Sequence, residues 1–312
     1  MVCLRIGTGA GMPRQPAAGL AARQPARSFG MAGTQSSGVW AFLGDGSSCK
    51  ILHPARAAAD GIEAAFLARA GMTGPEHIFE AKDGGLLTAM SDGGAISQLS
   101  QGLGEVYEIL NMDMKPYPCC RSAHCAIDGI LEIREQMEKR MGLKIQNKPE
   151  AEILVQQISE IEIDTYLVGY KQCAVSDGCL HPKTILDAKF STPYSVAAAF
   201  LYGSVGMEQF DPEVVLDPAV QKLLEKVRVR PLERFTEQYP KHWGCHVKVI
   251  MQDGTAYEAE VEDPSGSVAR PLSRKQAMKK AEEFLSVVCP GREQKTIEEL
   301  LNLESREQLP II

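Results

Sequence analysis

The richest chemistry in this chain lies in ten consecutive residues, 115–124, which read Lys-Pro-Tyr-Pro-Cys-Cys-Arg-Ser-Ala-His. Lys115, Arg121 and His124 can each donate hydrogen bonds to a carboxylate. The two prolines between them fix φ and lack an amide donor, so they are not expected inside a helix or a central strand. We therefore expect a rigid, kinked entry to the helix that follows. The alternative is a turn with a cis proline and solvated charges.

A second cationic pair, Lys50 and His53, stands between the turn signal Gly44-Asp45-Gly46 and the start of the next helix. Taken by themselves, these positions are typical of a solvated turn lysine followed by a histidine that caps the helix.

Four possible metal ligands lie close together in the sequence: Cys119, Cys120, His124 and Cys125. The two adjacent cysteines do not have the usual Cys-x-x-Cys spacing, and no second correctly spaced pair accompanies them. We therefore predict no metal site. The glycine-rich spots lack the context of a phosphate-binding loop, so we predict no nucleotide either.

The composition narrows the possible partners. The chain has 312 residues, of which 44% are hydrophobic and 23% charged, and its formal net charge is −7. An acidic protein is a poor default partner for nucleic acid or an anionic membrane. No apolar run approaches the roughly 20 residues that span a bilayer. The nine cysteines form no small disulfide framework, which favours a reducing cytoplasm.

The hydrophobic periodicity predicts the elements that must position these side chains. Helices are expected at 54–71, 125–141, 193–203, 218–227, 272–288 and 296–303, and a strand at 158–163. Residues 245–251 and 255–261 flank a Gln-Asp-Gly turn and predict a β-hairpin. Ser191 or Thr192 is expected to cap the helix that begins at Pro193. The order predicts a mainly α fold with an α+β insertion.

The first 29 residues differ from the rest, because they contain four arginines but no lysine and no acidic residue. A transit peptide and a disordered leader are two interpretations. A mistranslated or wrongly started stretch is the third, and it is the one we favour, since GC-rich codons specify alanine, arginine, glycine and proline.

Several long blocks, in the same order, are similar to the MmgE/PrpD family, which includes 2-methylcitrate dehydratase, cis-aconitate decarboxylase and iminodisuccinate epimerase. The blocks are 30–38, 42–54, 57–75, 115–124 and 188–197. The resemblance runs from about residue 30 to 303 and implies an N-terminally truncated chain. It also implies a partial helical domain at 30–102, an α+β lid at 103–264 and C-terminal helices at 265–312 that return to the helical domain, with the active site between domain and lid.

The resemblance assigns roles to single residues. It implies that Lys50 and Lys115 bind carboxylates and that His53 lines the pocket, while Arg121 offers a bidentate fork that is less secure. His124 would be a pocket donor or a solvent-facing histidine. Tyr194 would donate a hydrogen bond, or a proton if a nearby lysine lowers its pKa; the alternative is a core tyrosine.

The function implied is that of a cofactor-independent lyase on a small di- or tricarboxylate, similar to 2-methylcitrate dehydratase. Such a reaction takes a proton from carbon next to a carboxylate that lysines hold. An isomerase, epimerase or decarboxylase of the same family is the alternative. The family also implies a homodimer. Because nothing here matches the aspartate and histidines of the family's N-terminal part, a catalytically inactive fragment is a further possibility.

Overall fold

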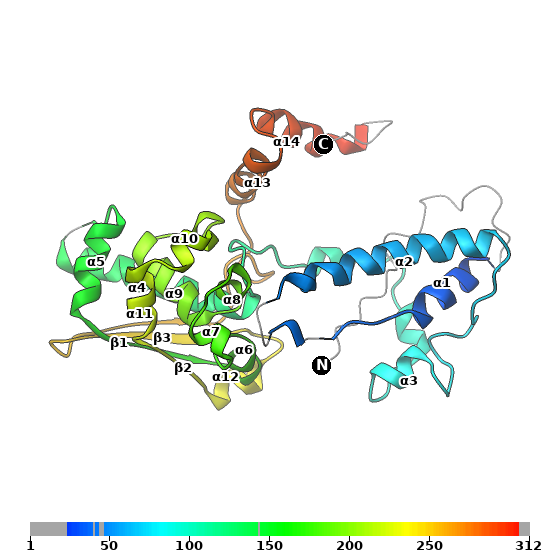
Figure 1. Ribbon diagram of the computed structural model, residues 1–312, viewed down its shortest axis with the longest axis horizontal. Helices are drawn as coiled ribbons and strands as arrows, with labels where there is room; N and C mark the ends of the chain where they lie inside the picture. The colour runs from blue at the N-terminus through cyan, green and yellow to red at the C-terminus, as the bar shows by residue number, and fades with distance from the viewer. Residues whose placement is uncertain (1–23, 40, 44–46, 143, 306–312) are drawn as a thin grey trace. The chain divides into compact units, whose positions relative to one another are not determined.

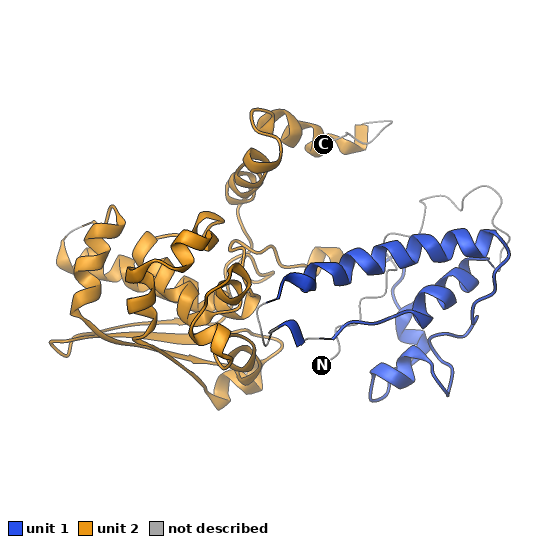
Figure 2. Cartoon of the chain, viewed as in Figure 1, with its two compact units in different colours: residues 1–108 blue, residues 109–312 orange. Residues whose placement is uncertain are grey.

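The computed structural model describes residues 24–39, 41–43, 47–142 and 144–305. The chain forms two compact units that divide between Glu108 and Ile109 (Figure 2). The predicted turn at Gly44-Asp45-Gly46 and most of the predicted leader lie outside the described residues. Helices dominate both units and one mixed sheet accompanies them, which confirms a mainly α fold with an α+β part. No helix in these ranges has the length and apolar character that crossing a membrane requires.

Unit 1 contains α1 (Gln24–Thr34), α2 (Leu52–Arg69) and α3 (Leu86–Met90) (Figure 1). Its 3-10 turns are η1 (Ala41–Leu43), η2 (Ser48–Ile51) and η3 (Ile96–Leu99). The small core brings Met31 of α1 against Ala64 and Ala68 of α2. A Cβ at Gly30 would lie 2.1 Å from the carbonyl oxygen of Pro75, so only glycine permits this close approach. The predicted helix at 54–71 is confirmed as α2.

Helix α1 crosses the predicted boundary at residue 29. Residues 24–29 were predicted to belong to a disordered or mistranslated leader, and they are helical. Pro25 lies in the first turn of α1, where its missing N–H has no intrahelical partner to lose. Proline spacing alone therefore did not reveal helix α1.

The sheet of unit 2 has four strands: β1 (Ile158–Thr165), β2 (Val227–Pro231), β3 (Cys245–Met251) and β4 (Ala256–Val261). Their order is β2-β1-β3-β4, with β1 and β2 parallel and the other neighbours antiparallel. The predicted hairpin and the strand from Ile158 are confirmed. The helix predicted at 218–227 ends at Leu224 instead, because Val227 and Val229 alternate with arginines and begin β2.

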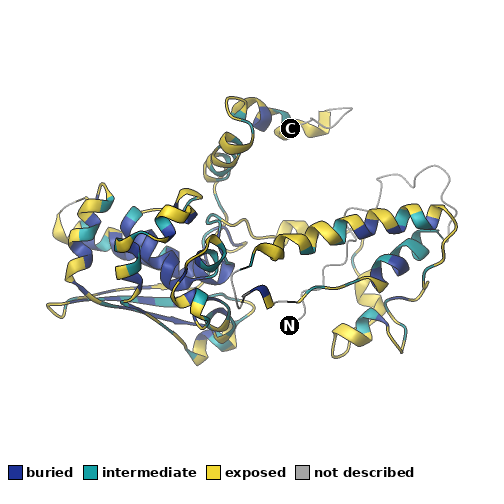
Figure 3. Ribbon diagram, viewed as in Figure 1, coloured by how far each residue is buried: buried dark blue, intermediate teal, exposed yellow. Residues whose placement is uncertain are grey.

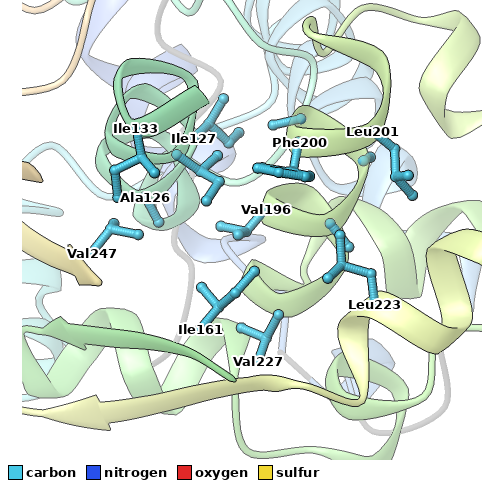
Figure 4. Close-up of a cluster of buried hydrophobic side chains, with 14 of the residues drawn as sticks. Ala126, Ile127, Ile133, Ile161, Val196, Phe200, Leu201, Leu223, Val227 and Val247 are labelled. Carbon is cyan, nitrogen blue, oxygen red and sulfur yellow. The ribbon is translucent and has the colours of Figure 1, made fainter. Parts of the chain in front are cut away.

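Two helices cover one face of the sheet, α4 (His124–Met141) and α9 (Thr192–Tyr202) (Figure 1). Ile127 and Ile133 of α4 and Val196 of α9 point toward Ile161 and Val247 of the strands (Figure 4). In α9 ten of the eleven residues are buried, which makes it the central helix of the unit (Figure 3). The predicted cap is confirmed, since the side chain of Ser191 accepts a hydrogen bond from the amide of Tyr194.

The remaining helices of unit 2 surround this core. They are α5 (Lys148–Gln157), α6 (Leu167–Cys173), α7 (Asp177–Leu180), α8 (Ile185–Lys189), α10 (Pro212–Val215), α11 (Pro218–Leu224), α12 (Glu233–Gln238), α13 (Arg274–Val288) and α14 (Glu293–Leu301). The 3-10 turns are η5 (Arg121–Ala123), η6 (Glu208–Phe210) and η7 (Leu303–Ser305), and η4 (Glu108–Asn111) crosses the division between the units. Helices α13 and α14 confirm the two predicted C-terminal helices and are grouped with unit 2; their return to a helical domain stays a prediction.

Candidate functional site

The segment 115–124 lies in unit 2 and enters α4 through η5. It is fixed to its surroundings by main-chain hydrogen bonds, from Met114 N to Gly266 O at 2.8 Å and from Cys120 N to Lys189 O at 2.8 Å. Among the described residues the cis peptide bond is Tyr239-Pro240, so the alternative of a cis-proline turn in this segment is wrong. The segment thus enters α4 through a kink at η5, as predicted, and its rigidity stays a prediction.

Arg121 is buried, with 8% of its surface exposed. One end of its guanidinium donates to the carboxylate of Asp113, with Nη2 and Oδ2 2.7 Å apart. Nη1 lies 3.2 Å from the carbonyl oxygen of Ser265 and 3.3 Å from Nδ1 of His124. Nε has no hydrogen-bond partner within the part of the chain that the structure describes. The cation is therefore held in one orientation, and one of its donors is buried and unsatisfied.

His124 is completely buried at the start of α4, and the ring of Tyr117 packs edge-on against it with centroids 5.1 Å apart. A guanidinium can only donate, so Nδ1 of His124 accepts from Arg121. Burial, followed by the charges of Arg121 and Lys115, lowers the pKa of His124 to about 3. The imidazole is therefore neutral at pH 7 and carries its proton on Nε2. That atom has no partner of hydrogen-bond geometry among the described residues.

Lys115 is exposed, and its Nζ donates to the carbonyl oxygen of Cys119 at 3.1 Å. Its own carbonyl accepts a hydrogen bond from Lys280 of α13. Burial and the nearby charge of Lys115 lower the pKa of Lys280. The charge of Lys280 in turn disfavours protonation of His124. Lys115, Arg121 and Lys280 thus converge around a neutral histidine, with Asp113 as the carboxylate that pairs with Arg121. Such an arrangement attracts an anion.

A shell of polar contacts supports the segment. The hydroxyl of Tyr117 donates to Oδ1 of Asp128 at 2.6 Å, and the amide of Ser265 donates to Oδ2 at 2.6 Å. Sequence reasoning missed Asp113, Asp128 and Ser265. Asp128 could have been predicted from the sequence, because it follows His124 by four positions and so shares one face of the predicted helix. Ser265 is 144 positions from Arg121, and no local signal connects them.

Tyr194 lies in the core of unit 2 and is completely buried. Its hydroxyl donates to the carbonyl oxygen of Gln209. Burial, with the nearby Tyr202 and Asp217, raises its pKa far above the usual value. The condition for proton donation, a lowered pKa, is not met in this structure, and the buried position is the one expected of a core tyrosine. None of these contacts joins the hydroxyl of Tyr194 to Arg121 or His124. A catalytic role for Tyr194 stays a prediction.

The other predicted pair, Lys50 and His53, lies in unit 1. Lys50 is exposed on η2, and His53 is half-buried in the first turn of α2, edge-on to Phe42 with ring centroids 5.7 Å apart. His53 makes no capping hydrogen bond, so the capping alternative is wrong. It lines a pocket of about 470 Å³ together with Arg56 and Asp60, whose Nε and Oδ1 are 2.8 Å apart. Lys50 is not among the residues that line this pocket.

Within the described ranges, three side chains are close enough together to hold a metal ion. They are His242, Glu262 and Asp263, and their ligand atoms lie within 4.8 Å of one another. His242 Nδ1 and Asp263 Oδ2 are 2.9 Å apart, which is an ordinary ion-pair distance. None of the four residues at 119–125 that raised the question of a metal belongs to this group.

Comparison with known families identifies the class. The model of the MmgE/PrpD C-terminal domain matches residues 117–304, and the model of the N-terminal domain matches residues 2–99. The chain belongs to the MmgE/PrpD family. The N-terminal match begins at residue 2, so it includes the stretch at 1–29 that was predicted to be foreign and gives no support to the predicted truncation.

Three relatives place the chain within the family. It is 27% identical over 298 residues to a cis-aconitate decarboxylase-like protein, oryM, of Aspergillus oryzae, covering 92% of this chain and 58% of the relative. It is 26% identical to the alkylcitrate dehydratase phiI of a fungal species, covering 78% and 47%. It is 24% identical to the cis-aconitate decarboxylase of Mus musculus, covering 84% and 51%. The chain thus spans about half the length of these relatives.

Proposed function

We propose that this chain is a cofactor-independent lyase that acts on a small di- or tricarboxylate, most similar to a 2-methylcitrate dehydratase. The observation that carries the proposal is the convergence of Lys115, Arg121 and Lys280 around the buried, neutral His124. The relatives named for cis-aconitate and for alkylcitrate support the substrate class. Both names refer to a compound that carries several carboxylates, and fixed cations bind carboxylates well.

The roles follow from the contacts of each side chain. Arg121 has a buried, unsatisfied Nε–H that we assign to a substrate carboxylate, and the exposed Lys115 supplies a second charge. Nε2–H of His124 donates a hydrogen bond to the same anion. A bound carboxylate offsets the repulsion that lowers the pKa of His124, so we expect substrate binding to raise this pKa and to draw a proton into the site.

Decarboxylation is the second candidate, because three of the relatives found carry that activity in their names. Both reactions pass through negative charge on the carbon skeleton next to a carboxylate, and fixed cations stabilise that charge in either case. The products distinguish them, since a dehydratase releases water and keeps every carboxylate, whereas a decarboxylase releases carbon dioxide.

The test is turnover by the purified chain with 2-methylcitrate and with cis-aconitate, followed by proton NMR of the products. Arg121→Gln should lower kcat/KM by about 10²–10³, while the exposed Lys139→Gln, on the following helix α4, should leave it unchanged. Equal turnover by Arg121→Gln would overturn the site. A cooperatively folded chain that turns over neither acid would overturn the lyase proposal and favour the inactive fragment.

We propose a homodimer as well, on the family resemblance alone. Light scattering of the purified chain at several concentrations measures its mass directly, and a mass of about one chain throughout would refute the dimer.

A further inference from the structure

Residues 264–270 form a loop between β4 and α13. Within this loop the amide of Gly266 donates to the carbonyl oxygen of Arg270 at 2.7 Å, which closes a turn. The carbonyl oxygen of Gly266 accepts a hydrogen bond from the amide of Met114 at 2.8 Å. The loop is therefore a compact turn that lies against the residue just before segment 115–124.

Arg121 makes two of its contacts through this loop. Its Nη1 donates to the carbonyl oxygen of Ser265 at 3.2 Å, which is a direct contact with the loop. Its Nη2 donates to Oδ2 of Asp113 at 2.7 Å. Oδ1 of the same carboxylate accepts a hydrogen bond from the amide of Val268 at 3.2 Å. The loop thus supplies one acceptor for the guanidinium and fixes the carboxylate that supplies another, so the orientation of Arg121 depends on the loop.

Asp128 of α4 attaches the loop at a second point, and only 7% of its side chain is exposed. Its Oδ2 accepts a hydrogen bond from the amide of Ser265 at 2.6 Å, and its Oδ1 accepts one from the hydroxyl of Tyr117 at 2.6 Å. Nη1 of Arg270 lies 3.6 Å from the same Oδ2. Hydrogen bonds to a charged carboxylate are among the stronger ones in proteins. The carboxylate therefore joins the loop to the aromatic ring that packs against His124.

We propose that Asp113 and Asp128 are positioning residues that attach residues 264–270 to the candidate site, and that the attached loop holds Arg121 in the orientation that binds a carboxylate. This inference rests on the proposed function, in which Arg121 binds the substrate. Asp113 acts through the guanidinium, and Asp128 acts through the loop. A cation that is oriented before the ligand arrives loses less freedom on binding, so detachment of the loop should weaken binding.

The first experiment uses the wild-type full chain and measures hydrogen–deuterium exchange by mass spectrometry of peptides. The amides of Ser265 and Val268 are hydrogen-bonded, so residues 264–270 should exchange at least about tenfold more slowly than a synthetic peptide of the same sequence. Coupling between two events is reciprocal: if the attached loop favours binding, binding favours the attached loop. Saturating cis-aconitate should therefore slow exchange of residues 264–270 by a further factor of about five or more.

The second experiment separates positioning from structural support by calorimetric titration with cis-aconitate. Asp128→Ala removes two hydrogen bonds, so exchange of residues 264–270 should become about tenfold faster and binding about tenfold weaker. Asp128→Asn should restore both, because its amide group can accept from Ser265 and donate to Tyr117. Both variants lose the charge, so their difference reports the hydrogen bonds. The control Asp164→Ala removes a carboxylate of similar burial on β1 and should change neither measurement.

Three results would overturn the proposal. They are fast exchange of residues 264–270 in the wild-type chain, exchange that cis-aconitate leaves unchanged although it binds, and an Asp128→Ala chain that exchanges fast yet binds as tightly as the parent. A wild-type chain with a protected loop that binds no cis-aconitate is a different outcome. It is the failure of the proposed function, and the role of the loop in binding fails with it. The wild-type measurements need no substitution, so a variant that does not fold leaves the test intact.

Discussion

Arg134 of α4 makes a contact whose loss has a calculable effect. It is 6% exposed, and its two terminal nitrogens donate to the carbonyl oxygen atoms of Phe200 at 2.9 Å and Ile145 at 2.8 Å. Phe200 is in the last turn of α9, where carbonyl groups have no intrahelical partner. Arg134 therefore caps the central helix of unit 2 from a neighbouring helix, and its charge favours the negative end of α9.

We predict that Arg134→Met, which keeps most of the side-chain volume, destabilises unit 2 by about 3 kcal/mol. Each buried carbonyl left without a donor costs about 1–3 kcal/mol, which gives about 2–6 kcal/mol for the two. Relief of the desolvation of the guanidinium offsets part of this loss, which favours the lower half of that range. For a unit of about 200 residues, 3 kcal/mol corresponds to a fall in Tm of about 6–12 °C.

The assay is urea unfolding followed by tryptophan fluorescence in a Trp40→Phe background, so that the signal comes from Trp243 in unit 2. The control is Lys139→Gln, an exposed change on the same helix, which should stay within about 0.5 kcal/mol of the parent. A loss below about 1 kcal/mol for Arg134→Met would show that the two carbonyls find other donors and would refute this account of the cap.

Two further predictions concern the surroundings of Arg121. Gly266 has φ +78, and a Cβ there would lie 1.9 Å from the carbonyl oxygen of Met114, so Gly266→Ala should separate these backbones. The control is Gly254→Ala, because Gly254 has φ +84 but open space around the added Cβ. Its loss of stability measures the backbone strain alone, about 1 kcal/mol. Urea midpoints that are equal for the two variants would contradict the close contact. The folded pKa of His124, about 3, lies below the unfolded value of about 6.5. Its contribution to stability is therefore complete above pH 6.5 and is lost as the pH falls from 6.5 toward 3, at up to about 1.4 kcal/mol per pH unit. His124→Gln should lower that slope, as measured by urea unfolding between pH 4.5 and 6.5, whereas the exposed His181→Gln should not; an unchanged slope for His124→Gln would refute the buried, neutral histidine.

The sequence predicted the elements whose patterns are local. The hairpin has a turn signal between two alternating strands, and α9 has a cap, an N-terminal proline and an apolar run. Short helices such as α7 and α10 were missed, because four residues contain too little periodicity to recognise. Strand β2 was missed for a similar reason, and the predicted helix at 218–227 overlapped only its first residue.

The candidate site was predictable only in part. The composition of 115–124 indicated anion-binding chemistry, and the structure brings Arg121 and His124 into direct contact. It could not indicate which side chains are buried, since that depends on Ser265 and Lys280, which are far away in the sequence. The hydrogen bond of Tyr194 could not be derived from the sequence either, because a buried phenol can be satisfied by a backbone carbonyl that no sequence pattern specifies.

The central claim is that the cations around His124 bind a carboxylate. Isothermal titration calorimetry of the full chain with cis-aconitate, in buffers of different ionisation enthalpy, tests binding and proton uptake together. We expect saturable binding with net proton uptake, binding about tenfold or more weaker in Arg121→Gln, and binding unchanged in Lys139→Gln. Binding of equal strength in the parent and in Arg121→Gln, with no proton uptake, would contradict the account.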